Sequence, residues 1–283
     1  MEINEFIFVI PLKTFSTKMA DGWKIDLGKT KTTLENLDRT LLSIDNAANQ
    51  FDENLTINVF ISGHENPFDQ EFFHFLKNVY EKINIKFICN DFNRPADKNE
   101  YMKDKRRKKH SALKALYETT AHQDEKETFL MFIDADDLVS SNFLIRTIEL
   151  FRENDCDDIA LVSGYVFDHR NKVCGFLDGK KKLFYRNCGS SFISRISGRD
   201  LEKDGILYKL GNHVRFPEIA ENHNRNVYFC FDPMVLWLVN HGQNDASERH
   251  GDQRMINFVK QYRCDHKRLL PLNESFPFLY YKT

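Results

Sequence analysis

A run of five apolar residues that ends abruptly in acidic ones constrains this chain more than any other feature. Residues 129–133 read Phe-Leu-Met-Phe-Ile and are followed directly by Asp134-Ala135-Asp136-Asp137. A short, wholly apolar run is typical of a strand that is buried on both faces. Carboxylates crowded at its end repel one another unless a cation lies between them, and Mg²⁺ or Mn²⁺ prefers oxygen ligands. The pattern predicts a metal site. The alternative is an acidic turn and helix N-cap, where Asp is also common.

Short apolar runs alternate with amphipathic segments over the first 170 residues. This alternation predicts an α/β fold with βαβ units, a mostly parallel sheet and right-handed crossovers. Ligands of such sheets bind beyond the carboxyl ends of the strands, so residues that follow strands are candidates for binding. They include Pro11, Lys13, Glu65 and Asp91. The predicted strands are 6–11, 56–62, 85–89, 128–133 and 159–167, and the predicted helices are 34–48, 70–83, 104–118 and 142–153.

The second half of the chain is less regular. Segments 183–185, 191–194 and 227–230 are strand-like, and 234–240 fits a helix or a strand. Residues 16–33 are polar and rich in lysine, and we expect them to form a mobile loop near the ligand-binding edge. No repeat or linker divides the chain, so a single domain over residues 1–283 is predicted.

Composition excludes several classes of protein. The net charge of −2 argues against a general nucleic-acid binder, which normally carries a basic excess. No segment approaches the roughly 18 apolar residues of a membrane span, and the N-terminus is acidic where a signal peptide is basic. We therefore expect a cytoplasmic protein, with peripheral contact at the inner face of a membrane left open. The six cysteines form no Cys-x-x-Cys pair and are expected to be free thiols.

Residues 133–140, Ile-Asp-Ala-Asp-Asp-Leu-Val-Ser, resemble the Asp-x-Asp motif of GT-A glycosyltransferases, especially bacterial enzymes of family 2. Residues 8–13 resemble the first strand and donor-binding turn of those enzymes, and residues 39–44 resemble their first helix. The likeness implies a GT-A fold, in which a mostly parallel, Rossmann-like sheet is flanked by helices and followed by a mixed C-terminal portion. Residues 1–170 would bind the nucleotide sugar, and residues 171–283 would form the acceptor side.

The resemblance also implies roles for the acidic residues. Asp134 would contact the ribose or the metal, Asp136 would ligate the metal that bridges the diphosphate, and Asp137 would support the site or face the donor sugar. Many GT-A enzymes complete the metal shell with a histidine roughly a hundred residues further on, a spacing that fits His241, and imidazole suits manganese-like ions. Residues 237–244 also resemble a Trp…His-Gly-x-Asn pattern in rhamnosyltransferase-like enzymes. His213 and His250 are weaker alternatives, and His241 could instead be satisfied by backbone at a turn.

Three further groups are candidates. The basic helix offers Lys105, Arg106 and Lys109 to donor phosphate or base, although a basic run is more often a solvated face, and RNA or an anionic membrane is a minor alternative. Asp232, before Pro233, is expected to begin a helix and act as general base, or to be a plain N-cap. Phe231 replaces the Glu of the family's usual Glu-Asp pair, which leaves the base and the stereochemistry open. Glu218 and Glu221 are alternative bases, 189–192 would form a loop near the sugar, and Trp237 would stack on sugar or lie in the core.

The expected function is sugar transfer from a UDP- or dTDP-linked donor to a glycan or lipid-linked glycan in bacterial capsule or lipopolysaccharide synthesis, with Mn²⁺ or Mg²⁺ as cofactor. One alternative is a haloacid dehalogenase-like phosphatase with Asp134 as nucleophile. That family normally has Thr or Val at the position of Leu138 and carries its motif near the N-terminus. A nucleotidyltransferase would need a glycine-rich loop after the first strand. A non-catalytic nucleotide- or carbohydrate-binding module on the same fold is the remaining alternative.

Overall fold

The computed structural model describes most of the 283-residue chain. The described residues are 3–13, 16–19, 22–25, 27–51, 55–64, 74–76, 78–93, 95, 100–120, 127–202, 205–209, 213–241, 252–265, 272 and 274–277.

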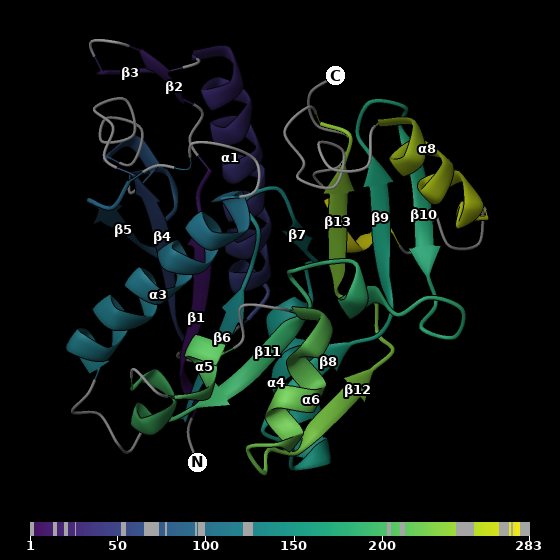
Figure 1. Ribbon diagram of the computed structural model, residues 1–283. Coiled ribbons are helices and arrows are strands. Elements are labelled where there is room, and N and C mark those ends of the chain that lie inside the picture. Colours follow the sequence, from purple (N-terminus) through teal and green to yellow (C-terminus); the bar gives the residue numbers. More distant parts are fainter. Residues whose placement is uncertain are drawn as a thin grey trace.

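A seven-stranded sheet forms the centre of the molecule, in the order β12-β8-β11-β6-β1-β4-β5 (Figure 1). The neighbours β5, β4, β1 and β6 are parallel, β12 is parallel to β8, and β11 runs antiparallel between β6 and β8. The predicted fold class, a mostly parallel α/β sheet with a mixed C-terminal portion, is therefore confirmed. The strands are β1 (Ile3–Pro11), β4 (Thr56–His64), β5 (Asn84–Asn90), β6 (Glu127–Phe132), β8 (Asp158–Leu161), β11 (Phe192–Ile196) and β12 (Val227–Cys230).

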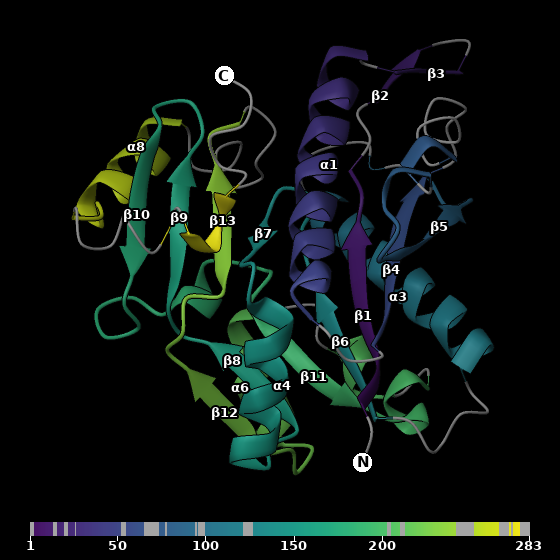
Figure 2. The same cartoon turned by 180° about the vertical axis from the view of Figure 1, so that it is seen from behind.

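Helices cover both faces of this sheet (Figures 1 and 2). Alternate residues of β1 point to opposite faces. Phe6, Phe8 and Ile10 pack in one core with α1 and α4, whereas Ile7 and Val9 pack in another with α3, α5 and α6. The helices are α1 (Leu27–Asn49), α3 (Tyr101–Thr120), α4 (Phe143–Asn154), α5 (Ile206–Lys209) and α6 (Phe216–Glu221).

A second sheet lies beside the first, in the order β10-β9-β13-β7, and packs against α8 (Asp252–Gln261). Its strands are β7 (Leu138–Val139), β9 (Gly164–Asp168), β10 (Val173–Leu177) and β13 (Val235–Val239). The remaining elements are the hairpin β2 (Ser16–Met19) and β3 (Gly22–Ile25), and the 3-10 helices η2 (Phe184–Arg186), η3 (Gly198–Leu201) and η4 (His213–Arg215).

The single strand predicted over residues 159–167 was wrong. The chain leaves the central sheet after Leu161 and enters the second sheet at Gly164 as β9. Glycine is required there, because a Cβ at position 164 would lie 2.5 Å from the ring of Phe184. That phenylalanine belongs to η2, so the strand predicted at 183–185 was also wrong.

Two other predictions needed correction. Residues 16–33 were expected to form a loop, but they contain β2, β3 and the first turns of α1. The helix predicted at 70–83 is seen at 74–76 and 78–79, residues 80–83 are not helical, and 70–73 and 77 lie outside the described residues. The ambiguous segment 234–240 contains a strand, β13, because it pairs with β9 and β7.

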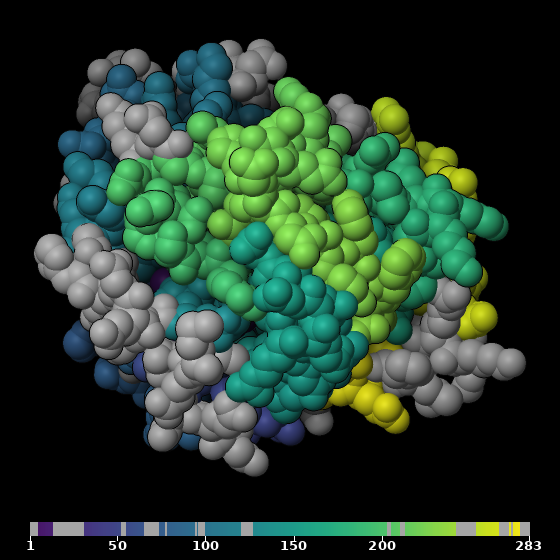
Figure 3. All heavy atoms as spheres, turned by 90° about the horizontal axis from the view of Figure 1, so that it is seen from below, coloured from purple at the N-terminus to yellow at the C-terminus, as the bar shows by residue number. Residues whose placement is uncertain are grey.

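Figure 3 shows the end at which the parallel strands begin, where the chain around α4 (teal) and from α6 to β12 (light green) forms a continuous surface. The turn after β6 lies at the opposite end of that strand. Within the described part of the chain, no helix combines the length and apolarity needed to cross a membrane.

Candidate metal and donor site

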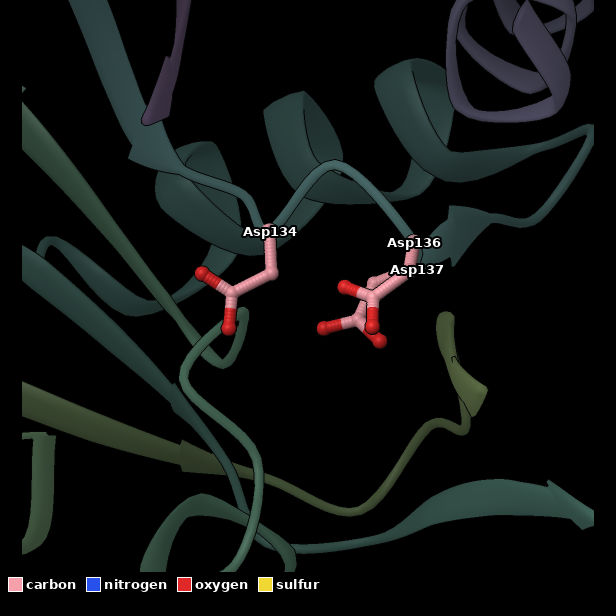
Figure 4. A group of neighbouring side chains, drawn as sticks. All are labelled: Asp134, Asp136 and Asp137. Atoms are coloured by element: carbon pink, nitrogen blue, oxygen red, sulfur yellow. The ribbon is translucent and has the colours of Figure 1, made fainter. Parts of the chain in front are cut away.

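The three carboxylates predicted to form a metal site lie together in the turn after β6. One ligand oxygen from each of Asp134, Asp136 and Asp137 lies within 4.8 Å of the others. Figure 4 shows their carboxylates pointing to the same side of the turn. The Asp137 backbone N–H donates to the Asp134 carbonyl at 3.1 Å and closes the turn. The motif therefore follows the fourth strand of the central sheet along the chain, as the resemblance implied.

Strand β13 brings His241 to this cluster. The Nε2 of His241 lies 2.6 Å from Asp136 Oδ2, and the His241 side chain is only 3% exposed. The two residues are 105 positions apart in the sequence. Oxygen and imidazole ligands in one place are a donor set that suits Mn²⁺ or Mg²⁺. The aspartates of the turn and the imidazole that contacts Asp136 thus form a donor set that fits a divalent cation.

Lysines on α3 face Asp134. The ammonium of Lys105 lies 2.7 Å from Asp134 Oδ2. Burial opposes ionisation of Asp134, but the charges of Lys105 and Lys109 outweigh it and hold the pKa of Asp134 below its usual value. Lys109 is buried, and burial together with the charge of Lys105 lowers its pKa to about 8, so it is still mostly charged at neutral pH. Arg106, the third predicted cation, is exposed on the same helix.

Asp137 has a different environment from its neighbours. It is buried, its Oδ2 accepts the Ser190 hydroxyl at 2.5 Å, and its Oδ1 accepts the Leu238 N–H at 3.2 Å. Burial, and then the charges of Asp136 and Asp134, raise the pKa of Asp137 well above its usual value. Since both oxygens accept protein donors, Asp137 joins the turn to the 188–190 segment and to β13.

The predicted loop 189–192 packs directly against the turn. The Ser190 hydroxyl accepts the Asp134 backbone N–H at 2.7 Å. A Cβ at Gly189 would lie 3.0 Å from Asp134 Oδ2, so glycine allows this close approach. The loop therefore holds the backbone of the motif and limits the space around Asp134.

The other predicted donor-binding residues lie at strand ends. Pro11 is buried at the end of β1, opposite Ser62 of β4. The Lys13 ammonium lies 4.1 Å from the centre of the Tyr101 ring at the start of α3. Asp91 is exposed just beyond β5. Glu65 and His250 lie outside the described residues.

The helix expected to begin at Asp232 was wrong. A bend and then β13 follow this residue, because residues 235–239 pair with the second sheet. The Asp232 carboxylate accepts a hydrogen bond from Arg146 Nε of α4 at 2.7 Å and is about half exposed.

The alternative residues have these positions: Glu218 pairs with Arg215 at 2.6 Å, Glu221 is exposed, and Trp237 packs edge-on against Phe258 with ring centres 6.0 Å apart. His213 lies on η4, and its charge contributes to the lowered pKa of Asp134, after burial and the two lysines.

Two residues of α1 at this site were not predicted. The Asn36 side chain contacts His241, with Nδ2 to Nδ1 at 3.1 Å, and Arg39 Nη1 contacts Asn36 Oδ1 at 3.2 Å. The sequence contains no signal for these contacts, because a polar residue in an amphipathic helix normally faces solvent.

Comparison with known proteins gave structural similarity alone. No protein-family model matches the chain, and no curated protein sequence matches it. The structure of S. aureus TarS has a TM-score of 0.48 and 15% identity over 97% of this chain and 44% of that chain. Residues 1–349 of S. aureus TarS with UDP-GlcNAc give 0.44 and 12%, over 86% of this chain and 61% of that one. The same fragment with UDP gives 0.45 and 13%, over 83% and 60%. The chain thus spans less than two thirds of each of these proteins.

Proposed function

We propose that this chain is a metal-dependent glycosyltransferase that moves a sugar from a nucleotide sugar to a glycan acceptor. The observation that supports this best is the cluster of Asp134, Asp136 and Asp137 after a central strand, where His241 Nε2 lies 2.6 Å from Asp136 Oδ2. That edge of a parallel sheet is where ligands of such folds bind. The proposed acceptor is a growing bacterial surface glycan, by the family resemblance.

In this proposal the described residues have different roles. Asp134, Asp136 and His241 hold Mn²⁺ or Mg²⁺, which when bound offsets the negative charge that a nucleoside diphosphate gains as it leaves. Lys105 and Lys109 place two more positive charges beside Asp134 for the same phosphates. Pro11, Lys13 and Asp91 lie at the strand ends where the nucleoside would bind, and Arg106 could reach the phosphates from the surface of α3. Asp137 supports the turn through Ser190 and Leu238.

Asp232 is the proposed general base. An acceptor hydroxyl gives up its proton as it attacks the sugar, and a positioned carboxylate can take that proton. The Arg146 bond to Oδ2 fixes the orientation of the Asp232 carboxylate on the exposed side of α4. An Asp232→Asn variant should therefore keep metal and donor binding while losing transfer to acceptor.

The experiment is release of nucleoside diphosphate from a panel of UDP- and dTDP-sugars, with and without Mn²⁺. We expect one donor to be hydrolysed only with the metal, and Asp136→Asn to lower that rate by about a hundredfold or more, equivalent to about 2.7 kcal/mol. Asp155→Asn is the matched control. Asp155 is exposed and has a left-handed backbone that asparagine also adopts, so this variant should retain the full rate.

Three results would contradict the proposal in different ways. Cleavage of phosphomonoesters dependent on Asp134 would indicate the phosphatase instead. Binding of a nucleotide without any turnover would indicate the non-catalytic module. Equal rates for the wild type and the Asp136→Asn variant would show that the carboxylate cluster is not the working site.

A further inference from the structure

A chain of polar contacts lies behind His241 and extends to α1 and the end of β9. His241 Nδ1 contacts the Asn36 amide at 3.1 Å, Asn36 Oδ1 contacts Arg39 Nη1 at 3.2 Å, and Arg39 Nη1 contacts His169 Nε2 at 3.3 Å. Asn36 is 3% exposed, so its amide has little access to water. The side of His241 away from Asp136 is therefore held by protein groups.

The direction of each hydrogen bond follows from Arg39. A guanidinium donates and never accepts, so the Asn36 atom that faces Arg39 is the amide oxygen. The Asn36 NH₂ group is then the one that faces His241, and it can only donate. His241 must accept at Nδ1, and a neutral imidazole that accepts at Nδ1 carries its hydrogen at Nε2. Nε2–H is thus the donor in the 2.6 Å contact with Asp136 Oδ2.

His169 keeps Arg39 in this orientation. Burial lowers the pKa of His169 to about 4, with smaller effects from the charges of Lys172 and Arg39, so the ring is neutral and its Nε2 can accept from Arg39. Arg39 therefore has acceptors on two sides, and exchanging the oxygen and NH₂ of Asn36 would set donor against donor. The Asn36 amide is fixed by what surrounds it.

We propose that Asn36, oriented by Arg39, is a positioning residue that holds His241 as an Nε2–H donor to Asp136. This hydrogen bond keeps the two proposed metal ligands bonded to each other until a cation replaces the hydrogen. Metal-bound histidines usually donate their other N–H to a carboxylate or carbonyl. Here the other nitrogen faces a donor, which opposes ligation through Nε2. This His241–Asp136 hydrogen bond therefore lowers the affinity of the site for a free cation. It favours a cation that binds together with a negatively charged ligand. The metal part of this inference rests on the proposed function.

The first test reads the tautomer of His241 in the metal-free protein, by long-range ¹H–¹⁵N NMR with His241→Ala to assign the signals. We expect the Nε2–H pattern in the wild type. In Asn36→Asp both oxygens accept, and in Arg39→Met the Asn36 amide is free to turn its oxygen toward the ring, so in both variants Nδ1 should carry hydrogen. A wild type that carries hydrogen on Nδ1, or two variants in which Nδ1 carries none, would overturn the inference. If Asn36→Asp does not fold, Arg39→Met alone tests the inference.

The second test measures Mn²⁺ affinity by the EPR signal of the free ion. Asn36→Asp and Arg39→Met should bind Mn²⁺ about tenfold more tightly than the wild type. Lys172→Asn is the charge-matched control, since it removes one positive charge near His169 from an exposed residue in the left-handed region, and the hydrogen bonds of this network do not involve Lys172. It should change neither the hydrogen positions on His241 nor the Mn²⁺ affinity. An equal gain in Mn²⁺ affinity in Lys172→Asn would indicate a general charge effect and overturn the role given to the hydrogen bond. Absence of Mn²⁺ binding in every variant, with the tautomers as expected, would refute the metal site of the proposed function and leave the hydrogen-bond assignment standing.

Discussion

Three neighbouring aspartates of one turn have three different environments. Asp134 faces the Lys105 ammonium, Asp136 contacts His241, and Asp137 is buried with both oxygens bonded to protein donors. Their chemical identity is the same, so the difference comes from what each side chain meets. The charges around Asp134 favour its ionised form, whereas burial beside two other carboxylates disfavours ionisation of Asp137.

Ser190 should be the residue whose loss most disturbs this turn. It accepts the Asp134 N–H and donates to Asp137, so Ser190→Ala leaves the part-buried Asp134 N–H and the buried Asp137 carboxylate without this partner. We expect unfolding free energy to fall by about 1–3 kcal/mol, measured by urea denaturation, and Mn²⁺ affinity to fall as well because the backbone of Asp134 is released.

Ser191→Ala is the control for that variant. The Ser191 hydroxyl donates to the Cys188 carbonyl at 2.8 Å, and neither of these groups is a predicted metal ligand. It should lower stability without changing Mn²⁺ affinity. If the Ser190→Ala variant also binds Mn²⁺ like the wild type, Ser190 does not position the ligands.

At the scale of elements, α3 is attached to the central sheet by a buried polar cluster as well as by apolar packing. Asp104 of α3 contacts His64 of β4 at 2.7 Å and Lys108 at 2.6 Å, and all three residues are buried. The cluster sets the position of the helix that carries Lys105 and Lys109. An error in its position would move both lysines relative to Asp134.

This cluster predicts an acid-sensitive contribution to stability. Burial opposes ionisation of Asp104, but the His64 hydrogen bond and the Lys108 charge outweigh it and lower its pKa. A carboxyl with a lowered pKa stabilises the fold above its unfolded pKa of about 4, and the contribution is lost as pH falls through the folded value. The stability gap between the wild type and Asp104→Asn should therefore be full above about pH 5 and shrink below about pH 4, in urea denaturation at each pH.

Glu118→Gln tests whether that effect is specific. Glu118 is exposed on the same helix and lies 3.9 Å from Lys114, a geometry that contributes little to stability. It should give no measurable gap at any pH. A gap for Asp104→Asn that stays constant as the solution is acidified would contradict the lowered pKa.

At the scale of the whole molecule, the two halves of the sequence share one sheet. β11 lies between β6 and β8, and β12 extends the sheet beyond β8, although both come from the second half of the chain. The Asp137 bond to Leu238 further joins the turn of the central sheet to β13 of the second sheet. We therefore expect that the donor half and the acceptor half expected from the sequence cannot be separated by cutting the chain between them.

A fragment of residues 1–170 should not fold alone. Removing β11 exposes the pairing edges of β6 and β8, which promotes association between chains. We expect the fragment to aggregate or to lack a cooperative unfolding transition, by size-exclusion chromatography and circular dichroism, whereas the full chain should give a monodisperse peak and a cooperative transition. A monomeric fragment with cooperative unfolding would show that the first half is an independent domain.

The sequence by itself determined the features that depend on local pattern. The apolar run before Asp134 predicted a buried central strand, and the alternation of strands and helices predicted the α/β class. Both predictions were possible because the spacing of apolar residues along a short segment indicates its secondary structure and its buried face. The spacing of His241 from the acidic motif suggested a role only through family resemblance. Nothing local distinguished Asp137 from Asp136.

Tertiary structure decided what depends on partners distant in the chain. It split residues 159–167 between two sheets at Gly164, where the Phe184 ring excludes a side chain, and it turned the residues after Asp232 into a strand by pairing them with β9. It also brought Asn36 against His241, 205 residues away. Such contacts depend on how elements pack, and packing is a property of the whole chain rather than of any one segment.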